Sequence, residues 1–193
     1  MPRPDIVIAE PTICDTQAEM WEMIALHYGV PVFRLDGAFR FEEDIAPHQL
    51  EWRVSELKRL VRFIVENTNA KFDWDRFKET MKLSGEAHSL WNRIQDFRKA
   101  VPCPRLAREM FGDIFYLATM PGSHEALDYL TKVLKDVEER VEMGIGEARE
   151  ERFRIFYDNV PIWYRLELFD YLLEHGAAVV LEAITCFSWG ALY

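Results

Sequence analysis

The stretch Asp5-Ile-Val-Ile-Ala-Glu-Pro-Thr-Ile-Cys-Asp-Thr-Gln17 decides how the beginning of the chain folds. Its first part, residues 5–9, is a short apolar run rich in β-branched side chains, which predicts a buried parallel strand. Pro11 ends that strand, and residues 18–27 have a helical pattern of apolar side chains. Cys14 is therefore expected in the turn after a strand, close to a helix N-terminus. In an open α/β sheet this is the carboxyl edge, where ligands bind.

Two interpretations of Cys14 follow from this position. The positive end of a helix dipole favours a thiolate, which is the form that ligates metal or acts as a nucleophile. Thr12 or Asp15 is suited to cap the helix by accepting backbone N–H bonds. The alternative is a small cysteine buried in the loop, which is the common fate of unpaired cysteines.

Composition and charge exclude several classes of protein. The 193 residues can bury one sizeable core or two small ones. A net charge of −10 argues against a nucleic-acid partner, because phosphate binding needs a basic face. No window approaches 18 uninterrupted apolar residues, so no membrane-spanning segment is expected. Three widely spaced cysteines form no disulfide framework and fit a cytoplasmic protein.

The remaining pattern predicts an α/β fold in which two strand–helix–strand segments flank a helical middle. The first segment covers residues 5–35, and the second has strands at 153–157 and 177–183 around a helix at 166–175. Residues 45–143 have a helical period. Two parallel strands with one helix cannot cover their own faces, since most sheets have about four to six strands. Either the two segments share one sheet or each belongs to a larger domain, and we favour the larger domain.

Three features of the middle region are interpreted as structural. The first predicted helix buries an apolar stripe from Leu50 to Ile64, and its charged residues, including Glu56, face water. Gly85 lies inside the second helix at a cost of about 1 kcal/mol, which suggests close approach to a neighbour or a ligand. The charged run at 147–152 is expected to be an interdomain linker.

Five stretches resemble one known family in their order along the chain. They are Thr12-Ile-Cys-Asp-Thr-Gln17, Lys82-Leu-Ser-Gly-Glu-Ala87, Met110-Phe-Gly-Asp-Ile-Phe-Tyr116, Asp158-Asn-Val-Pro-Ile-Trp163 and Gly176-Ala-Ala-Val-Val180. Together they cover nearly the whole chain. They resemble the 2-hydroxyacyl-CoA dehydratase family, which includes benzoyl-CoA reductase subunits.

The resemblance implies Rossmann-like α/β domains joined by a helical region. Residues 1–40 then correspond to the C-terminal part of a first Rossmann-like domain, 41–150 to the helical region, and 151–193 to the start of a second Rossmann-like domain. Family members hold a [4Fe–4S] cluster through three cysteines and leave one iron open. Cys14 matches the middle cysteine, while the first would precede the chain and the last would follow it. The chain is therefore expected to be a fragment, with a cluster that is incomplete or absent.

The resemblance also implies an activity and partners. The complete subunit would remove water from an (R)-2-hydroxyacyl-CoA through a ketyl radical, giving an enoyl-CoA. Its partners would be a second subunit and an ATP-hydrolysing iron–sulfur activator that supplies the electron. Benzoyl-CoA-type ring reduction, and a non-catalytic scaffold or partner subunit without a cluster, remain alternatives. This chain alone is expected to be inactive.

Other residues have candidate roles beside structural alternatives. Asp15, Thr16 and Gln17 follow the cysteine and either contact the cluster or substrate or cap the helix. Trp163 either lines the acyl pocket or is a core residue. Cys103 and Cys186 are expected to be packing residues. A small basic cluster either meets a coenzyme A phosphate or is a solvated face, which we favour; it contains Arg98, Lys99, Arg105 and Arg108.

Overall fold

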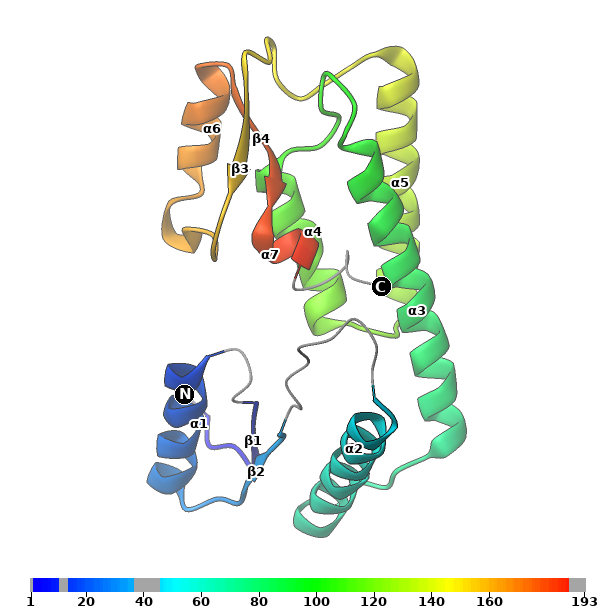
Figure 1. The fold of residues 1–193 in the computed structure, drawn as a ribbon, viewed down its shortest axis with the longest axis vertical. Coiled ribbons are helices and arrows are strands. Elements are labelled where there is room, and N and C mark those ends of the chain that lie inside the picture. Colours follow the sequence, from blue (N-terminus) through cyan, green and yellow to red (C-terminus); the bar gives the residue numbers. More distant parts are fainter. Residues whose placement is uncertain (1, 11–13, 37–45, 188–193) are drawn as a thin grey trace. The chain divides into compact units, whose positions relative to one another are not determined.

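The computed structural model describes residues 2–10, 14–36 and 46–187, and it divides the chain into two compact units, residues 1–73 and 74–193. Short parallel strands near both ends flank a helical middle, which confirms the predicted α/β fold class (Figure 1). The expected domain limits at residues 40 and 150 stay predictions, and the first of them lies outside the described residues. In the described ranges, no helix combines the length and the apolar character needed to cross a membrane.

The first unit contains the predicted strand–helix–strand segment. Strand β1 (Val7–Ala9) and strand β2 (Val32–Arg34) pair in parallel, and helix α1 (Asp15–Tyr28) connects them. Gly29 ends α1 in the left-handed conformation, with φ of 63°, and its position allows the last turn to close. Ala18 and Ala25 are the buried residues of α1, so small side chains allow the helix to lie close to the strands.

Helix α2 (Pro47–Asn67) differs from its sequence pattern. Glu56 is buried and forms an ion pair with Arg59, whereas Leu50, Val54 and Leu57 of the expected buried stripe are exposed. The prediction that Glu56 faces water is wrong. A carboxylate can be buried when a guanidinium compensates its charge, and the charge pattern of one helix does not reveal such burial.

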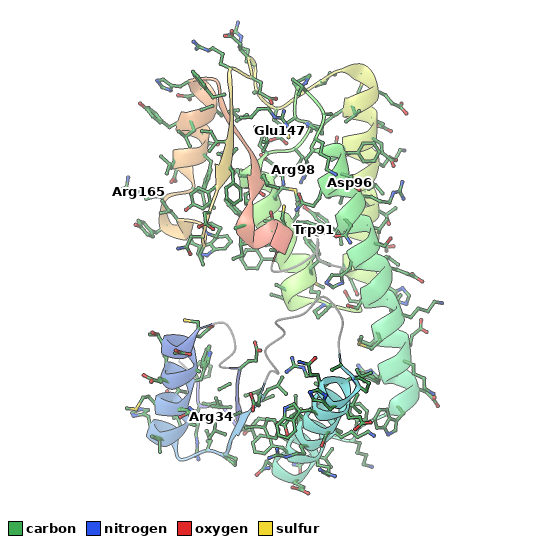
Figure 2. The ribbon with its side chains drawn as sticks, viewed as in Figure 1. Arg34, Trp91, Asp96, Arg98, Glu147 and Arg165 are labelled. Atoms are coloured by element: carbon green, nitrogen blue, oxygen red, sulfur yellow. The ribbon has the colours of Figure 1, made fainter. Side chains whose placement is uncertain are left out.

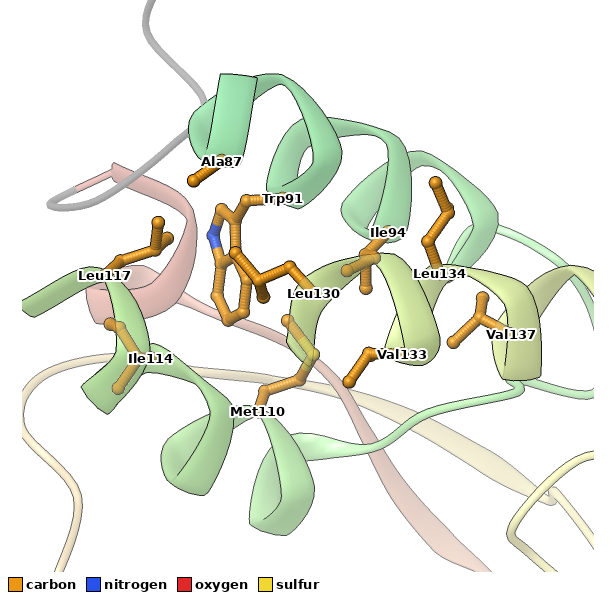
Figure 3. Close-up of a cluster of buried hydrophobic side chains, with 10 residues drawn as sticks. All are labelled: Ala87, Trp91, Ile94, Met110, Ile114, Leu117, Leu130, Val133, Leu134 and Val137. Atoms are coloured by element: carbon orange, nitrogen blue, oxygen red, sulfur yellow. The ribbon is translucent and has the colours of Figure 1, made fainter. Parts of the chain in front are cut away.

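Three helices form the main core of the second unit. They are α3 (Trp74–Phe97), α4 (Ala107–Thr119) and α5 (His124–Met143). Their apolar stripes meet in a cluster of ten buried residues, in which Trp91 lies between Leu117 and Leu130 (Figure 3). The cluster consists of Ala87, Trp91, Ile94, Met110, Ile114, Leu117, Leu130, Val133, Leu134 and Val137. This helical core is what supports the second pair of strands.

Strands β3 (Phe153–Tyr157) and β4 (Ala177–Glu182) pair in parallel, and helix α6 (Glu167–Glu174) connects them. The register shifts between Ile155 and Phe156. Phe111 of α4 packs with Phe169 of α6 and Val179 of β4, so this small sheet is anchored to the helical core. Two short elements were not predicted: the 3-10 helix η1 (Trp163–Arg165) and helix α7 (Ala183–Phe187). Both are only one turn long and have too few residues for a detectable period.

Candidate functional site

The carboxyl ends of the parallel strands are the first places to look for a site. In the first unit, β1 leads through residues outside the described ranges to Cys14 at the start of α1. In the second unit, β3 leads to a loop and then to Trp163, and β4 leads directly into α7. Each unit therefore has its own candidate residues, which are described in turn.

Cys14 occupies the N-cap position of α1. Its backbone is extended (φ −148°, ψ 107°), and its carbonyl accepts a hydrogen bond from the Ala18 N–H at 3.1 Å. The side chain makes no capping bond and is exposed, so the alternative of a buried cysteine is wrong. A thiol with this exposure at a helix N-terminus is available as a ligand.

The three residues after Cys14 form the exposed first turn of α1. Asp15 is the acidic residue of that turn, and Thr16 and Gln17 are also exposed. Because Cys14 itself holds the N-cap position, Asp15 is not the N-cap. Thr12, the other capping candidate, lies outside the described residues. Asp15, Thr16 and Gln17 therefore occupy the first three helical positions after the N-cap.

The described residues do not fit a complete [4Fe–4S] cluster. Such a cluster is ordinarily held by four cysteine thiolates, and in this family the resemblance implies three. In the described part of the chain, no three His, Cys, Asp or Glu side chains are grouped so that they could hold a metal ion. Cys103 and Cys186 belong to the second unit and are buried. Cys14 is thus a candidate for one ligand, and no chemical step of a cluster can be derived from these residues.

The buried thiols of Cys103 and Cys186 are also poor metal ligands because their raised pKa values keep them protonated. Burial raises the pKa of the Cys103 thiol, which donates a hydrogen bond to the Arg105 carbonyl at 3.2 Å. Burial likewise raises the pKa of the Cys186 thiol. A raised pKa disfavours the thiolate, the form that binds metal. Both residues therefore act in packing.

Trp163 is part of an aromatic cluster beyond the end of β3. Its ring lies 5.9 Å from that of Phe111 and 5.4 Å from that of Phe115, measured between centroids. Phe111 is fully buried and also contacts Tyr157 and Phe169. By contrast, Trp163 is 43% and Phe115 48% exposed. The buried Phe111 ring thus contacts Trp163, which in turn contacts Phe115, and these last two side chains keep about half of their surface open.

The sequence did not identify Phe115 as a candidate. Its spacing places it on the same side of the helix as Met110, Phe111 and Ile114, which predicts burial. The structure buries those three residues and leaves Phe115 half-exposed beside Trp163. The available signal was the succession of two aromatic residues, Phe115 and Tyr116, at the end of an apolar stripe. They point in different directions, since Tyr116 stacks on Tyr129.

The loop that carries Trp163 is a tight turn. Asn159 adopts the left-handed conformation with φ of 81°, which asparagine tolerates better than most residues. Its side-chain oxygen accepts a bond from the Val160 N–H at 2.7 Å, and the Asp158 carboxylate accepts one from the Asn159 N–H at 2.8 Å. The Tyr157 hydroxyl donates to the Val160 carbonyl at 3.2 Å. These local bonds hold the turn through which the chain reaches η1.

A buried ion pair lies at the carboxyl end of β4. Arg98 and Glu182 are both almost fully buried, and Arg98 Nη1 lies 3.0 Å from Glu182 Oε2. Figure 2 labels Arg98 on this side of the second unit. Desolvation lowers the pKa of the guanidinium, but the charge and hydrogen bonds of Glu182 outweigh it, so the pKa of Arg98 is raised. Arg98 stays charged and compensates the buried carboxylate.

Helix α3 also binds α7, which directly follows β4. Trp91 Nε1 donates to the Thr185 carbonyl at 2.9 Å, and Gln95 Nε2 donates to the same oxygen at 3.3 Å. The Thr185 hydroxyl donates to Glu182 Oε2 at 2.6 Å. The end of β4 is therefore fixed by a buried, mutually satisfied network.

The prediction of a solvated basic face holds for Lys99 and Arg108, which are exposed, and is wrong for Arg98 and Arg105, which are largely buried. Arg98 pairs with Glu182, Arg105 pairs with the buried Asp113 at 2.6 Å, and Arg108 forms an exposed pair with Asp170. Lys99 lies on the surface beside Asp96. Sequence proximity around the proline break suggested one basic surface, but each arginine has a carboxylate partner elsewhere in the chain. These pairs also leave no concentrated positive charge for a coenzyme A phosphate.

Comparison of the sequence with known proteins shows the family of this chain. The family model for "2-hydroxyglutaryl-CoA dehydratase, D-component" matches residues 1–192. The chain belongs to this family. The resemblance inferred from the sequence is thereby confirmed.

Several curated relatives are similar along most or all of the chain. The (R)-phenyllactyl-CoA dehydratase alpha subunit of Clostridium sporogenes is 25% identical and covers 100% of this chain. The alpha subunit of (R)-2-hydroxyglutaryl-CoA dehydratase from Acidaminococcus fermentans is 26% identical over 91% of the chain. A benzoyl-CoA reductase subunit of Thauera aromatica is 27% identical over 100% of the chain. All three are subunits of larger enzymes by name.

The chain spans less than half the length of these relatives. The matched region is 48% of the phenyllactyl-CoA dehydratase subunit, 37% of the 2-hydroxyglutaryl-CoA dehydratase subunit and 46% of the benzoyl-CoA reductase subunit. The family is therefore shown for residues 1–192 of this chain, which match only part of each relative, as expected for a fragment of such a subunit.

Proposed function

We propose that this chain is part of a subunit of a cytoplasmic 2-hydroxyacyl-CoA dehydratase. The reaction is the loss of water from an (R)-2-hydroxyacyl-CoA, which gives the corresponding enoyl-CoA. The match of the family model to residues 1–192 carries this proposal. Four of the matched relatives are dehydratase alpha subunits, and they act on acyl groups as different as lactoyl and phenyllactyl by name. The partners we propose are a second subunit and an ATP-hydrolysing iron–sulfur activator.

Within that enzyme, we assign Cys14 as one ligand of a [4Fe–4S] cluster whose other ligands come from outside the described residues. Three observations support this assignment: the thiol is exposed, it follows a parallel strand, and it stands at the N-terminus of a 14-residue helix. Asp15, Thr16 and Gln17 are proposed as neighbours that hydrogen-bond the cluster or the substrate. All three are exposed on the first turn of the same helix.

On the substrate side, we propose that Trp163 contributes to the acyl pocket and that Phe115 does so beside it. Aromatic rings supply apolar surface with little conformational entropy to lose. Both rings are half-exposed, and the Trp163 ring contacts both Phe115 and the buried Phe111. Such a surface suits the hydrocarbon part of an acyl group and contributes nothing to the carboxylate of a glutaryl group.

Ring reduction of benzoyl-CoA is the second candidate. The similarity to the benzoyl-CoA reductase of Thauera aromatica extends over 100% of the chain, at an identity comparable to that of the dehydratases. An aromatic acyl group would also suit the Trp163 and Phe115 surface. The two reactions differ in substrate and product, so the same experiment separates them.

The experiment uses the full-length subunit that contains this chain, together with its partner subunit and activator, without oxygen. (R)-phenyllactyl-CoA, (R)-2-hydroxyglutaryl-CoA, (R)-lactoyl-CoA and benzoyl-CoA are supplied separately with ATP, and products are measured by mass spectrometry. We expect an enoyl-CoA, lighter than its substrate by the mass of one water, from at least one hydroxyacyl-CoA. Product from benzoyl-CoA alone would replace the dehydratase proposal by the reductase, and no product from any of them would favour a non-catalytic subunit.

Variants connect the activity to the proposed residues. Cys14→Ser should abolish product formation, while Cys186→Ala, which removes a buried thiol, should retain it. Trp163→Ala should raise KM by about tenfold for phenyllactyl-CoA, which corresponds to a loss of about 1.4 kcal/mol of apolar contact. KM for lactoyl-CoA should change little. Equal changes for both substrates would remove Trp163 from the acyl pocket.

A further inference from the structure

Tyr157 is the last residue of β3, and the structure fixes its backbone at the carboxyl end of the sheet. It lies opposite Glu182 in the parallel register, so the two strands end side by side (Figure 1). Glu182 is held by Arg98 and by the Thr185 hydroxyl, and this end of β4 therefore has little freedom to move. Tyr157 thus begins the following loop from a rigid base.

The side chain of Tyr157 connects the aromatic cluster to this loop. Its ring centroid lies 5.3 Å from that of Phe169 and 6.2 Å from that of Phe111, and both of these residues are buried. Its hydroxyl group donates to the carbonyl of the exposed Val160 at 3.2 Å. A tyrosine combines an apolar ring with a polar tip, and here the ring packs in the core while the tip holds the loop.

Two residues separate Val160 from Trp163. One of them, Pro161, is buried, and its carbonyl accepts a bond from the Trp163 N–H at 2.9 Å. The Trp163 ring contacts Phe111, which is the same buried ring that contacts Tyr157. The segment is therefore held at its beginning by the Tyr157 hydroxyl and at its end by Phe111. A displacement of Val160 would move the short stretch of backbone that presents the indole ring.

We propose that Tyr157 is a positioning residue for acyl-group recognition, whose hydroxyl group fixes the loop that presents Trp163 to large or aromatic acyl groups. This inference rests on the proposed dehydratase function and concerns a residue behind the acyl surface. Trp163 keeps 43% of its surface open, so its position depends on its backbone as well as on the rings beside it. A lactoyl group offers little apolar surface to an indole ring, so the effect is confined to larger acyl groups.

The kinetic test uses Tyr157→Phe, which removes the hydroxyl group and keeps the ring, in the full-length subunit with its partner and activator. We expect KM for (R)-phenyllactyl-CoA to rise about fivefold, the factor that corresponds to one hydrogen bond of about 1 kcal/mol. KM for (R)-lactoyl-CoA and kcat for both substrates should change by less than about twofold, because binding of the larger acyl group alone is affected.

Tyr129→Phe is the matched control for the kinetic test. It removes another tyrosine hydroxyl of the second unit, which donates to Asp113 Oδ1 at 2.6 Å within the helical part. Loss of that bond lowers stability without altering the loop before Trp163. The ratio of the two KM values should therefore stay at the parent value in Tyr129→Phe. The same change of ratio in both variants would reduce the effect of Tyr157 to general destabilisation and overturn the proposal.

A spectroscopic measurement on the intact chain tests the positioning itself, without activity. The heteronuclear NOE of the Trp163 indole N–H reports its motion on the picosecond to nanosecond timescale, and Trp163→Phe assigns the signal. We expect a lower NOE in Tyr157→Phe and the parent value in Tyr129→Phe. Asn159→Gly tolerates the φ of 81° but loses the acceptor for the Val160 N–H, so it should also lower the NOE. This variant gives an answer even where Tyr157→Phe does not fold.

The outcomes separate this inference from the proposed function. Product formation by the parent with an unchanged ratio of KM values in Tyr157→Phe would overturn the positioning role alone. An indole as ordered in Tyr157→Phe and Asn159→Gly as in the parent would overturn it as well. Absence of product from every hydroxyacyl-CoA in the parent would be a failure of the proposed function. The role of Tyr157 in acyl recognition would then fall with it, while the NOE still decides whether its hydroxyl fixes Trp163.

Discussion

At the residue scale, the buried pair of Arg98 and Glu182 shows the limit of reading charges from sequence. Arg98 lies among other basic residues in the chain, which predicts a solvated surface. Its partner is 84 positions away and is reached only when α3 packs beside the end of β4. The pair is costly to break, because removal of one ion leaves the other buried without compensation.

Arg98→Met should lower the free energy of unfolding by about 3–5 kcal/mol, since Glu182 would remain buried without its cation. The double variant Arg98→Met/Glu182→Leu should recover much of that loss, because both charges are then absent. Urea unfolding monitored by circular dichroism measures the free energy of unfolding of the single and of the double variant. Lys99→Met, on the exposed surface next to Arg98, is the matched control and should change the stability by less than about 0.5 kcal/mol. A single variant no less stable than this control would contradict the assigned pair.

The three cysteines should differ in reactivity toward iodoacetamide in the metal-free chain. Cys14 is exposed at a helix N-terminus, whereas Cys103 and Cys186 are buried and their pKa values are raised. Because the thiolate is the reactive form, we expect Cys14 to be modified at least about tenfold faster at pH 8. Peptide mass spectrometry over time resolves the sites. Rapid modification of Cys103 or Cys186 before unfolding would contradict their buried placement.

At the scale of helices and strands, the hydrophobic period and the glycine and proline residues that end helices predicted most of the fold. The glycine after α1, the prolines after α3 and the β-branched runs of β1 and β4 are local signals, so sequence alone located those elements. Contacts between distant segments were not predictable. The burial of Glu56, the short helix α7 and the exposure of Phe115 depend on what packs beside each residue. The same holds for the candidate site. Cys14 and Trp163 follow strands and were predicted from the sequence, whereas Phe115 joins the site only through tertiary packing and was not.

Two glycines should respond in opposite directions to alanine. Gly85 lies inside α3, and no atom of the described residues lies within 4 Å of an added Cβ atom, so the suggested close approach to a neighbour is not found there. Gly85→Ala should stabilise the chain by about 0.5–1 kcal/mol. Gly122 has φ of +71°, and an added Cβ atom would lie 2.3 Å from Thr80 Cγ2 and 2.5 Å from the Thr80 carbonyl oxygen.

Gly122→Ala should therefore destabilise the chain by about 1–3 kcal/mol through backbone strain and steric overlap. Thermal unfolding monitored by circular dichroism compares the two variants with the parent chain. Equal shifts of Tm in the same direction would be inconsistent with the two glycine environments.

At the scale of the whole molecule, the two compact units differ in how much apolar surface they bury. The second unit contains the ten-residue helical core and the aromatic cluster around Phe111. In the described part of the first unit, the buried apolar residues are few and small apart from one phenylalanine. They are Val7, Ala9, Ala18, Ala25 and Phe33. A two-stranded sheet with two helices and so few buried apolar side chains is marginal on its own.

Residues 74–193 should therefore fold when they are produced separately, and residues 1–73 should not. The larger piece is expected to show a single cooperative urea transition with an m value of about 1–2 kcal/mol/M, and the smaller piece a gradual change without baselines. Circular dichroism and tryptophan fluorescence should agree for the larger piece. A cooperative transition of residues 1–73 alone would show that the first unit is a self-sufficient domain.

The most direct test of the proposed function is the iron and acid-labile sulfide content of the full-length subunit, purified with its partner and without oxygen. Cys14→Ser is compared with the parent and with Cys186→Ala in the same preparation. We predict about four irons and four sulfides per cluster in the parent and in the control. Cys14→Ser should lose most of both while the protein stays folded and bound to its partner. Full iron and sulfide in Cys14→Ser would contradict the role of Cys14 as a cluster ligand.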